Sequence, residues 1–247
     1  MLRLILSMNY PMLTRRSFTL AALCSTAAGL AGCSSIGNLS LPEGSPSKRR
    51  TLSRTLSVPN YAEVYAAYPG ERAPILPVNY RAIDPRYLRQ TVEFAGNAPA
   101  GSIVVDPGSY HLYYVESAKV ATRYGVGVGR EGFGWTGDAK INMKRDWPDW
   151  VPPREMVERE PEIKNRLEMT SRGLGVRGGP DSPLGARAMY LFGTHGEGDL
   201  GYRIHGTLEP ETVGSNVSSG CIRMINQDIA HLYARVAPGT PVTVLPV

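Results

Sequence analysis

From Ser102 onward, short runs of β-branched and aromatic residues alternate with turn-forming residues. The runs are "SIVVD", "HLYYVES", "KVATRYGVGVG", "YLFGTH", "GYRIHG" and "TPVTVLPV", and each is bounded by Gly, Pro, Asp or Asn. Several such runs at short spacing are typical of the strands of a sandwich or a barrel. The pattern therefore predicts a mainly β domain over residues 102–247.

Two segments have a helical rather than a strand-like pattern. "PPREMVEREPEIKNRL" places Pro153 in a first helical turn, and Pro161 limits the length of this helix. "NQDIAHLYARV" has apolar residues at helical spacing, namely Ile229, Leu232, Tyr233 and Val236. We expect Asn226 or Asp228 to cap this second helix.

The chain before Ser102 lacks such regular patterns. Residues 33–60 are rich in Ser, Pro and Gly and carry a cluster of positive charge, which predicts a flexible tether. Residues 61–101 combine tyrosines, prolines and arginines with little periodicity, and we interpret them as an irregular lead-in. Within the lead-in, "DPRYLRQTVEF" is compatible with a short helix that begins at Pro85.

Residues 1–32 have the pattern of an export signal. "TRRSFTL" precedes a short alanine-rich apolar stretch that ends in "LAGC". Paired arginines before such a stretch resemble a twin-arginine signal, and "LAGC" resembles the box in which a cysteine, here Cys33, receives lipid. The alternative is an ordinary secretory signal with Cys33 unmodified. Met1, Met8 and Met12 are all candidate start residues.

The distribution of charge excludes a nucleic-acid-binding domain. The formal net charge of the chain is +5. Residues 1–32 hold three arginines and no acid, and residues 33–58 hold four cations and one acid, which leaves −1 for residues 59–247. The basic excess therefore belongs to the N-terminal part, and the predicted β domain shows no basic footprint.

Cysteine usage directs attention to one thiol. Cys24 lies in the predicted signal and Cys33 at its end, so Cys221 is the single cysteine of the predicted domain. Exported proteins seldom keep an unpaired thiol, which makes Cys221 a candidate reactive group. A thiol at its ordinary pKa needs a nearby base to act as a nucleophile, and His205 is a candidate for that base.

The residues around Cys221 fit acyl-transfer chemistry. The backbone N–H groups of Gly220 and Cys221 could converge on an oxyanion, and Arg223 would face the same side as Cys221 in extended chain. A guanidinium in that place could hold a carboxylate. His205 and Cys221 are two ligands, fewer than the three or four that zinc requires, and although Asp199 and Glu209 could be recruited, their spacing matches no metal pattern. His111 and His195 are expected in structural or surface roles, and the tryptophans of residues 132–153 in packing or along a substrate groove.

"RIHGT" followed by "SSGCIRM" resembles the catalytic signature of the L,D-transpeptidase family, which remodels bacterial peptidoglycan. "GVGVGREGFGWTG", "WPDWVPP" and "PLGARAMYL" resemble the form of this domain common in Gram-negative bacteria. The resemblance covers residues 102–247 and implies a β-sandwich-like catalytic domain with a few short helices. It also implies that no metal or cofactor takes part.

By the same resemblance, Cys221 is the nucleophile and His205 the general base, with the Gly206 carbonyl orienting the histidine. Gly220 supplies backbone to the oxyanion site, and Arg223 and Ser219 are assigned to substrate binding. Many members have histidine where this chain has Ser219.

The resemblance implies a transpeptidase that forms cross-links or attaches proteins to the wall. Its partners would be peptidoglycan stem peptides, a wall-attached lipoprotein as acceptor, and the membrane through the lipid on Cys33. The expected location is the periplasm, with the lipid in the outer membrane. A carboxypeptidase or amidase that hydrolyses the same bonds remains an alternative, and so does a wall-binding lipoprotein without turnover. The sequence leaves open the acceptor, the balance of transfer and hydrolysis, the membrane leaflet and the oligomeric state.

Overall fold

The computed structural model describes residues 53–69, 72–130, 134–218 and 220–247. The predicted signal, Cys33 and Ser219 lie outside these residues. The described residues belong to one structural unit, Lys48–Val247. Strands are the main element, and none of the helices formed by the described residues is long and apolar enough to cross a membrane.

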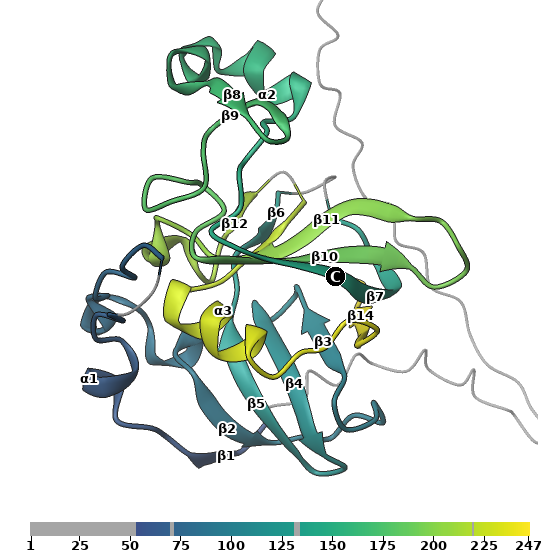
Figure 1. Cartoon of the computed structure of the whole chain (residues 1–247). Helices are drawn as coiled ribbons and strands as arrows, with labels where there is room; N and C mark the ends of the chain where they lie inside the picture. Colours follow the sequence, from purple (N-terminus) through teal and green to yellow (C-terminus); the bar gives the residue numbers. More distant parts are fainter. Residues whose placement is uncertain (1–52, 70–71, 131–133, 219) are drawn as a thin grey trace, which may run out of the picture. The chain divides into compact units, whose positions relative to one another are not determined.

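Ten strands of the described residues form one sheet, which closes around a core as a β-sandwich (Figure 1). In spatial order the strands are β1 (Thr55–Ser57), β2 (Gln90–Glu93), β5 (Val120–Gly125), β4 (His111–Ser117), β3 (Ile103–Asp106), β14 (Pro241–Val244), β7 (Gly137–Asp146), β10 (Arg187–Gly193), β11 (Asp199–His205) and β13 (Ile222–Arg223). Two further pairs join β6 (Val128–Gly129) to β12 (Asn216–Ser218) and β8 (Glu168–Thr170) to β9 (Gly173–Gly175).

The helices are few and short, as the sequence predicts. They are α1 (Tyr61–Val64), α2 (Arg154–Arg159) and α3 (Asn226–Tyr233), with the 3-10 turns η1 (Tyr80–Ala82), η2 (Pro85–Tyr87), η3 (Pro161–Arg166) and η4 (Pro210–Thr212). α2, η3, β8 and β9 form a projection beyond the sheet (Figure 1). Its two connecting segments run side by side, because Trp150 and Val176 exchange backbone hydrogen bonds.

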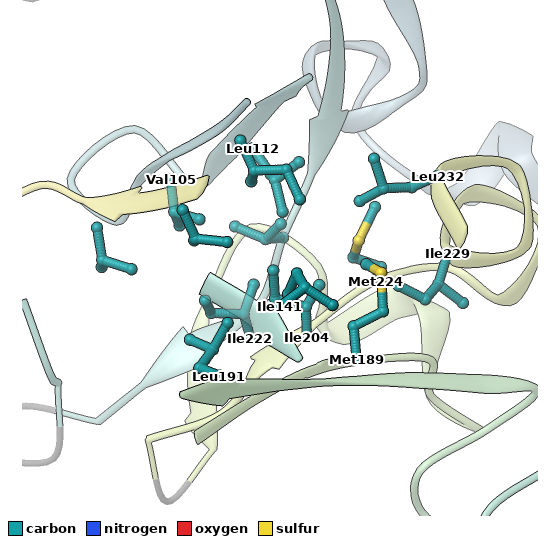
Figure 2. Packing of buried hydrophobic residues seen from close by; sticks show 14 of the residues in the cluster. Val105, Leu112, Ile141, Met189, Leu191, Ile204, Ile222, Met224, Ile229 and Leu232 are labelled. Atoms are coloured by element: carbon teal, nitrogen blue, oxygen red, sulfur yellow. The ribbon is translucent and has the colours of Figure 1, made fainter. Parts of the chain in front are cut away.

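The main core lies between the two halves of the sheet and α3. Figure 2 shows Val105 and Leu112 from β3 and β4 opposite Leu191, Ile204 and Ile222 from the other half. Met224, Ile229 and Leu232 close the core beside α3 (Figure 2). All of these side chains are buried, and their removal from water is the main force that holds the two halves together.

One local prediction is wrong, one is confirmed only in part, and one long strand was not predicted. The segment from Pro85 forms only the single turn η2 before the chain enters β2. Neither Asn226 nor Asp228 caps α3, whose N-cap is Ile225 without a side-chain hydrogen bond; the Asn226 amide is used elsewhere, as described below. The long strand β7 was not predicted, because its sequence is mostly polar, yet it lies between β14 and β10.

Residues 53–69 and 72–101 pack against the rest of this unit. β1 lies within the range predicted as a tether and pairs with β2, which pairs with β5. The Tyr65 hydroxyl donates to Asp228 Oδ2 at 3.1 Å and accepts the Arg89 backbone N–H at 2.8 Å. Arg89 Nε lies 3.7 Å from Asp228 Oδ1. Burial raises the pKa of Asp228 to about 7. These contacts join the lead-in to α3.

We expect Tyr65→Phe to destabilise the fold, because it leaves the Arg89 N–H and a buried Asp228 oxygen without their partner. The cost of unsatisfied buried groups is about 1–3 kcal/mol, which corresponds to a Tm lower by roughly 2–12 °C. Thermal unfolding followed by circular dichroism measures it, with Tyr68→Phe as the control because Tyr68 is exposed. Equal Tm values for the two variants would show that this network does not anchor the lead-in.

Candidate active site

The pairing of β11 with β13 brings the candidate residues together. The strands are parallel, with Ile204 opposite Ile222 and His205 opposite Arg223. Both isoleucines point into the core, so the residues that alternate with them point to the other face of the sheet. His205 and Arg223 therefore share this face with Cys221, which comes directly before β13. We call it the site face.

The turn before Cys221 is held by a serine. Ser218, at the end of β12, is buried; its hydroxyl donates to the Cys221 carbonyl at 2.5 Å and accepts the Gly220 N–H at 3.2 Å. Gly220 has a φ of +114°, which disfavours any residue with a side chain. The Gly220 N–H, assigned to the oxyanion site, thus has Ser218 Oγ as its partner in this structure.

His205 is buried and has a defined tautomer. Its Nδ1 lies 2.6 Å from the Gly206 carbonyl oxygen. Because a carbonyl can only accept, Nδ1 carries the hydrogen and Nε2 is the nitrogen able to take up a proton. Burial lowers the pKa of His205 to about 4, although the bond to Gly206 acts in the opposite direction. The imidazole is therefore neutral near pH 7.

Asn226 fixes the backbone that orients His205. Its Oδ1 accepts the Ala186 N–H at 2.9 Å, and its Nδ2 donates to the Thr207 carbonyl at 2.9 Å. A Cβ on Gly206 would lie 2.1 Å from Asn226 Oδ1, and a Cβ on Gly185 would lie 2.2 Å from it. Only glycine fits these close approaches, so the amide holds the segment that carries the Gly206 carbonyl.

Cys221 is half-buried, and its thiol is protonated at neutral pH. Burial raises its pKa, and the Arg203 backbone N–H and the charges of Arg203 and Arg223 act against this rise. Asp199 lies 3.2 Å from the Arg203 guanidinium, and Glu209 lies 3.2 Å from that of Arg223. Arg223, assigned to a substrate carboxylate, thus holds a carboxylate of this chain.

Two cavities lie near the candidate residues, although neither is lined by the Cys221 thiol. One, of about 530 Å³, lies over β7 and β10 and includes Trp147 and Tyr190. The other, of about 520 Å³, includes Gly220 and the stacked rings of Trp135 and Tyr202. Two of the three tryptophans therefore line cavities as well as pack.

His111 and His195 lie apart from this chemistry. His111 is buried and makes hydrogen bonds with the Arg86 carbonyl and Ser109 Oγ, while His195 lies on an exposed loop. Within the ranges that the structure describes, no three His, Cys, Asp or Glu side chains gather closely enough to hold a metal ion.

The sequence analysis did not identify three residues that shape the site. They are Ser218, which holds the turn, Asn226, which holds the backbone beside His205, and Arg203, whose charge acts on the Cys221 thiol. Arg203 could have been found from its alternation with His205 along one strand. Ser218 stands next to the glycine turn, but nothing in the sequence shows its hydrogen bonds. Asn226 resembles a helix cap, and only the fold shows that its amide faces the segment 185–207.

Comparisons with known proteins agree with the signature. The YkuD family model, described as the L,D-transpeptidase catalytic domain, matches residues 100–244. Two probable L,D-transpeptidases of Escherichia coli K12 are similar: YcfS is 32% identical over 60% of this chain and 45% of its own length, and YbiS is 32% identical over 57% and 43%. The chain thus spans less than half the length of these curated relatives.

A solved structure from Brucella melitensis, named as a probable carnitine operon oxidoreductase, is 47% identical, covers 68% of this chain and 99% of that one, and has a TM-score of 0.42.

We expect the modification rate of Cys221 by the uncharged reagent 2,2′-dithiodipyridine to rise continuously from about pH 5 to about pH 9, because the raised pKa keeps the thiol protonated. Digestion and mass measurement of the peptide that carries Cys221 separate it from Cys24 and Cys33. Protein unfolded in guanidinium is the control and should follow an ordinary thiol profile at lower pH. A rate that stays constant across the acid range would indicate a thiolate–imidazolium pair instead.

Proposed function

This chain belongs to the YkuD family of L,D-transpeptidase catalytic domains, and on that premise we propose that it is a cysteine-dependent L,D-transpeptidase of peptidoglycan stem peptides. The observation that carries the proposal is the shared site face of β11 and β13. There His205 on β11, with its Nδ1 held by Gly206, lies on the same face of the sheet as Cys221, which directly precedes β13.

The geometry suggests the following first half-reaction. His205 Nε2 takes the thiol proton as Cys221 Sγ bonds to the carbonyl carbon of the third stem residue, a diamino acid. The oxyanion is stabilised by backbone N–H groups of the turn, for which the Gly220 N–H must turn away from Ser218 Oγ. The bond to the terminal D-alanine then breaks, and the His205 proton passes to the leaving amine. The product is a thioester on Cys221.

In the second half-reaction an amine attacks the thioester and the thiol is restored. His205 removes the proton of the incoming amine and returns a proton to sulfur. The same thioester could pass to water, which would make the protein an L,D-carboxypeptidase or an amidase. The competition between amine and water depends on the acceptor side of the site. A wall-binding protein without turnover is disfavoured by the neutral, oriented imidazole.

We expect purified tetrapeptide muropeptides to give cross-linked dimers with the full chain and no product with Cys221→Ala, because the nucleophile is lost. Mass spectrometry of the products measures this, and an unchanged Tm of the variant shows that it is folded. Tripeptides alone would mean hydrolysis. Retained turnover in folded Cys221→Ala protein would contradict the mechanism.

The location of the protein is a further part of the proposal. Arg15 and Arg16 before the apolar stretch support export by the twin-arginine route, and "LAGC" supports lipid on Cys33. A lipid on Cys33 would tether the domain to a membrane facing the periplasm, where peptidoglycan lies. We place it at the outer membrane, with stem peptides and a wall-attached lipoprotein as its partners.

Metabolic labelling with a radioactive fatty acid is expected to mark the wild-type protein and to leave Cys33→Ala unmarked, because Cys33 provides the only thiol of the proposed lipid box. Cys24→Ala serves as the matched control and should label normally. Export of an Arg15→Lys, Arg16→Lys variant should fail. Equal labelling of Cys33→Ala and wild type would refute the lipid anchor.

A further inference from the structure

A row of side chains leads across the site face away from Cys221. Continuing the pairing of β11 with β13 by one residue places Arg203 opposite Cys221. Arg203 pairs with Tyr190 on β10, and Tyr190 pairs with Met143 on β7. Paired residues point to the same face, so this row shares the site face. Neighbouring strands lie about 4.8 Å apart, which puts Tyr190 roughly 10 Å from Cys221.

Tyr190 links the site to the cavity over β7 and β10. The guanidinium of Arg203 lies 4.9 Å from the centre of its ring and that of Arg172 lies 5.3 Å from it. Arg172 Nη1 also donates to the Tyr190 hydroxyl at 2.9 Å. The buried Tyr190 ring therefore has two guanidinium groups within cation–π distance. Arg172 belongs to the turn between β8 and β9, so the projection forms one wall of the cavity.

Three arginines line this cavity of about 530 Å³, which we call the arginine cavity. Its lining residues are Arg72, Met143, Arg145, Asp146, Trp147, Pro148, Asp149, Ser171, Arg172 and Tyr190. Its three arginines come from the lead-in, the sheet and the projection. Arg72 donates to the Trp147 carbonyl at 2.7 Å, and Arg145 to the Lys144 carbonyl at 3.1 Å. The ion pairs recorded among the described residues include none of these three arginines.

The cavity also holds two acids, so its lining has three cations against two carboxylates, and both acids have neighbours of their own. Asp149 accepts the Ser171 N–H, the Ser171 hydroxyl and the Gly178 N–H, so its carboxylate is engaged in holding the base of the projection. Asp146 is opposite Arg187 in the pairing of β7 with β10. The three guanidinium groups of the cavity are suited to a carboxylate, which they can bind through paired N–H donors.

We propose that the arginine cavity binds a carboxylate of the peptide whose scissile carbonyl lies at Cys221, and that Arg145 and Arg172 provide the main contacts. This inference rests on the proposed function and assigns the residues that hold an acidic group of its stem-peptide substrate. An extended chain advances about 3.3–3.6 Å per residue, so Tyr190, at the border of the cavity, lies within reach of the residues that precede the reacting carbonyl and of their side chains. Neutral peptides of the same length lose this contact.

Binding to the full chain with Cys221→Ala tests the inference without turnover. Calorimetry compares two probes, the synthetic tetrapeptide L-Ala-γ-D-Glu-diaminopimelate-D-Ala and the same peptide with its carboxylates amidated. Arg145→Gln and Arg172→Gln should each weaken binding of the acidic peptide by roughly three- to tenfold. Arg172→Lys keeps the positive charge and should therefore bind the acidic peptide more tightly than Arg172→Gln does. Arg177→Gln, in the same projection but paired with Glu168, should change binding less than about twofold.

The amidated peptide separates a direct contact from a structural effect. It should bind the parent protein more weakly and show no further loss with Arg145→Gln or Arg172→Gln. Equal losses for both peptides, or equal binding of the acidic peptide by the parent and both glutamine variants, would overturn the inference. If the wild type transfers acyl groups while the arginine variants bind the acidic peptide as tightly as the parent does, the inference about the cavity is wrong and the proposed function stands. If the binding pattern holds and the wild type makes no product, the proposed function fails alone.

Discussion

The parallel pairing of β11 with β13 is the constraint on which the site depends. Ile204 and Ile222 are opposite each other and buried in the main core. A strand that slipped by one residue would expose an isoleucine and bury an arginine, so the apolar core determines the register. The same register carries His205 and Cys221 to the opposite face. The chemistry of the site is therefore a consequence of hydrophobic packing on the other side of the sheet.

Packing alone does not determine the exact positions of His205 and Cys221, and buried hydrogen bonds fix them. Ser218 shapes the turn before Cys221, and Asn226 holds the backbone beside the Gly206 carbonyl that accepts from His205 Nδ1. Burial lowers the pKa of His205 and raises that of Cys221, so the structure favours a neutral thiol and a neutral imidazole on one face of the sheet. Proton transfer then accompanies attack on the carbonyl.

The sequence predicted the strand-rich class and most strands of the sheet, because those segments are themselves apolar and β-branched. It missed β7, whose polar residues form a strand only because β14 and β10 lie on its two sides. Asn226 was wrongly interpreted as a cap, since a local pattern does not show which distant backbone an amide meets. Cys221 and His205 were selected by residue type and motif, whereas the row through Arg203 and Tyr190 follows only from strand register.

The most direct measurement of the central claim is the mass of the enzyme itself during a single turnover. Full-length protein mixed with tetrapeptide stem in the absence of an amine acceptor, and quenched in acid, should carry one tripeptidyl group on the peptide that contains Cys221. Hydroxylamine should remove this group, as expected for a thioester. Release of D-alanine without any adduct on Cys221, or an adduct on another residue, would contradict the account.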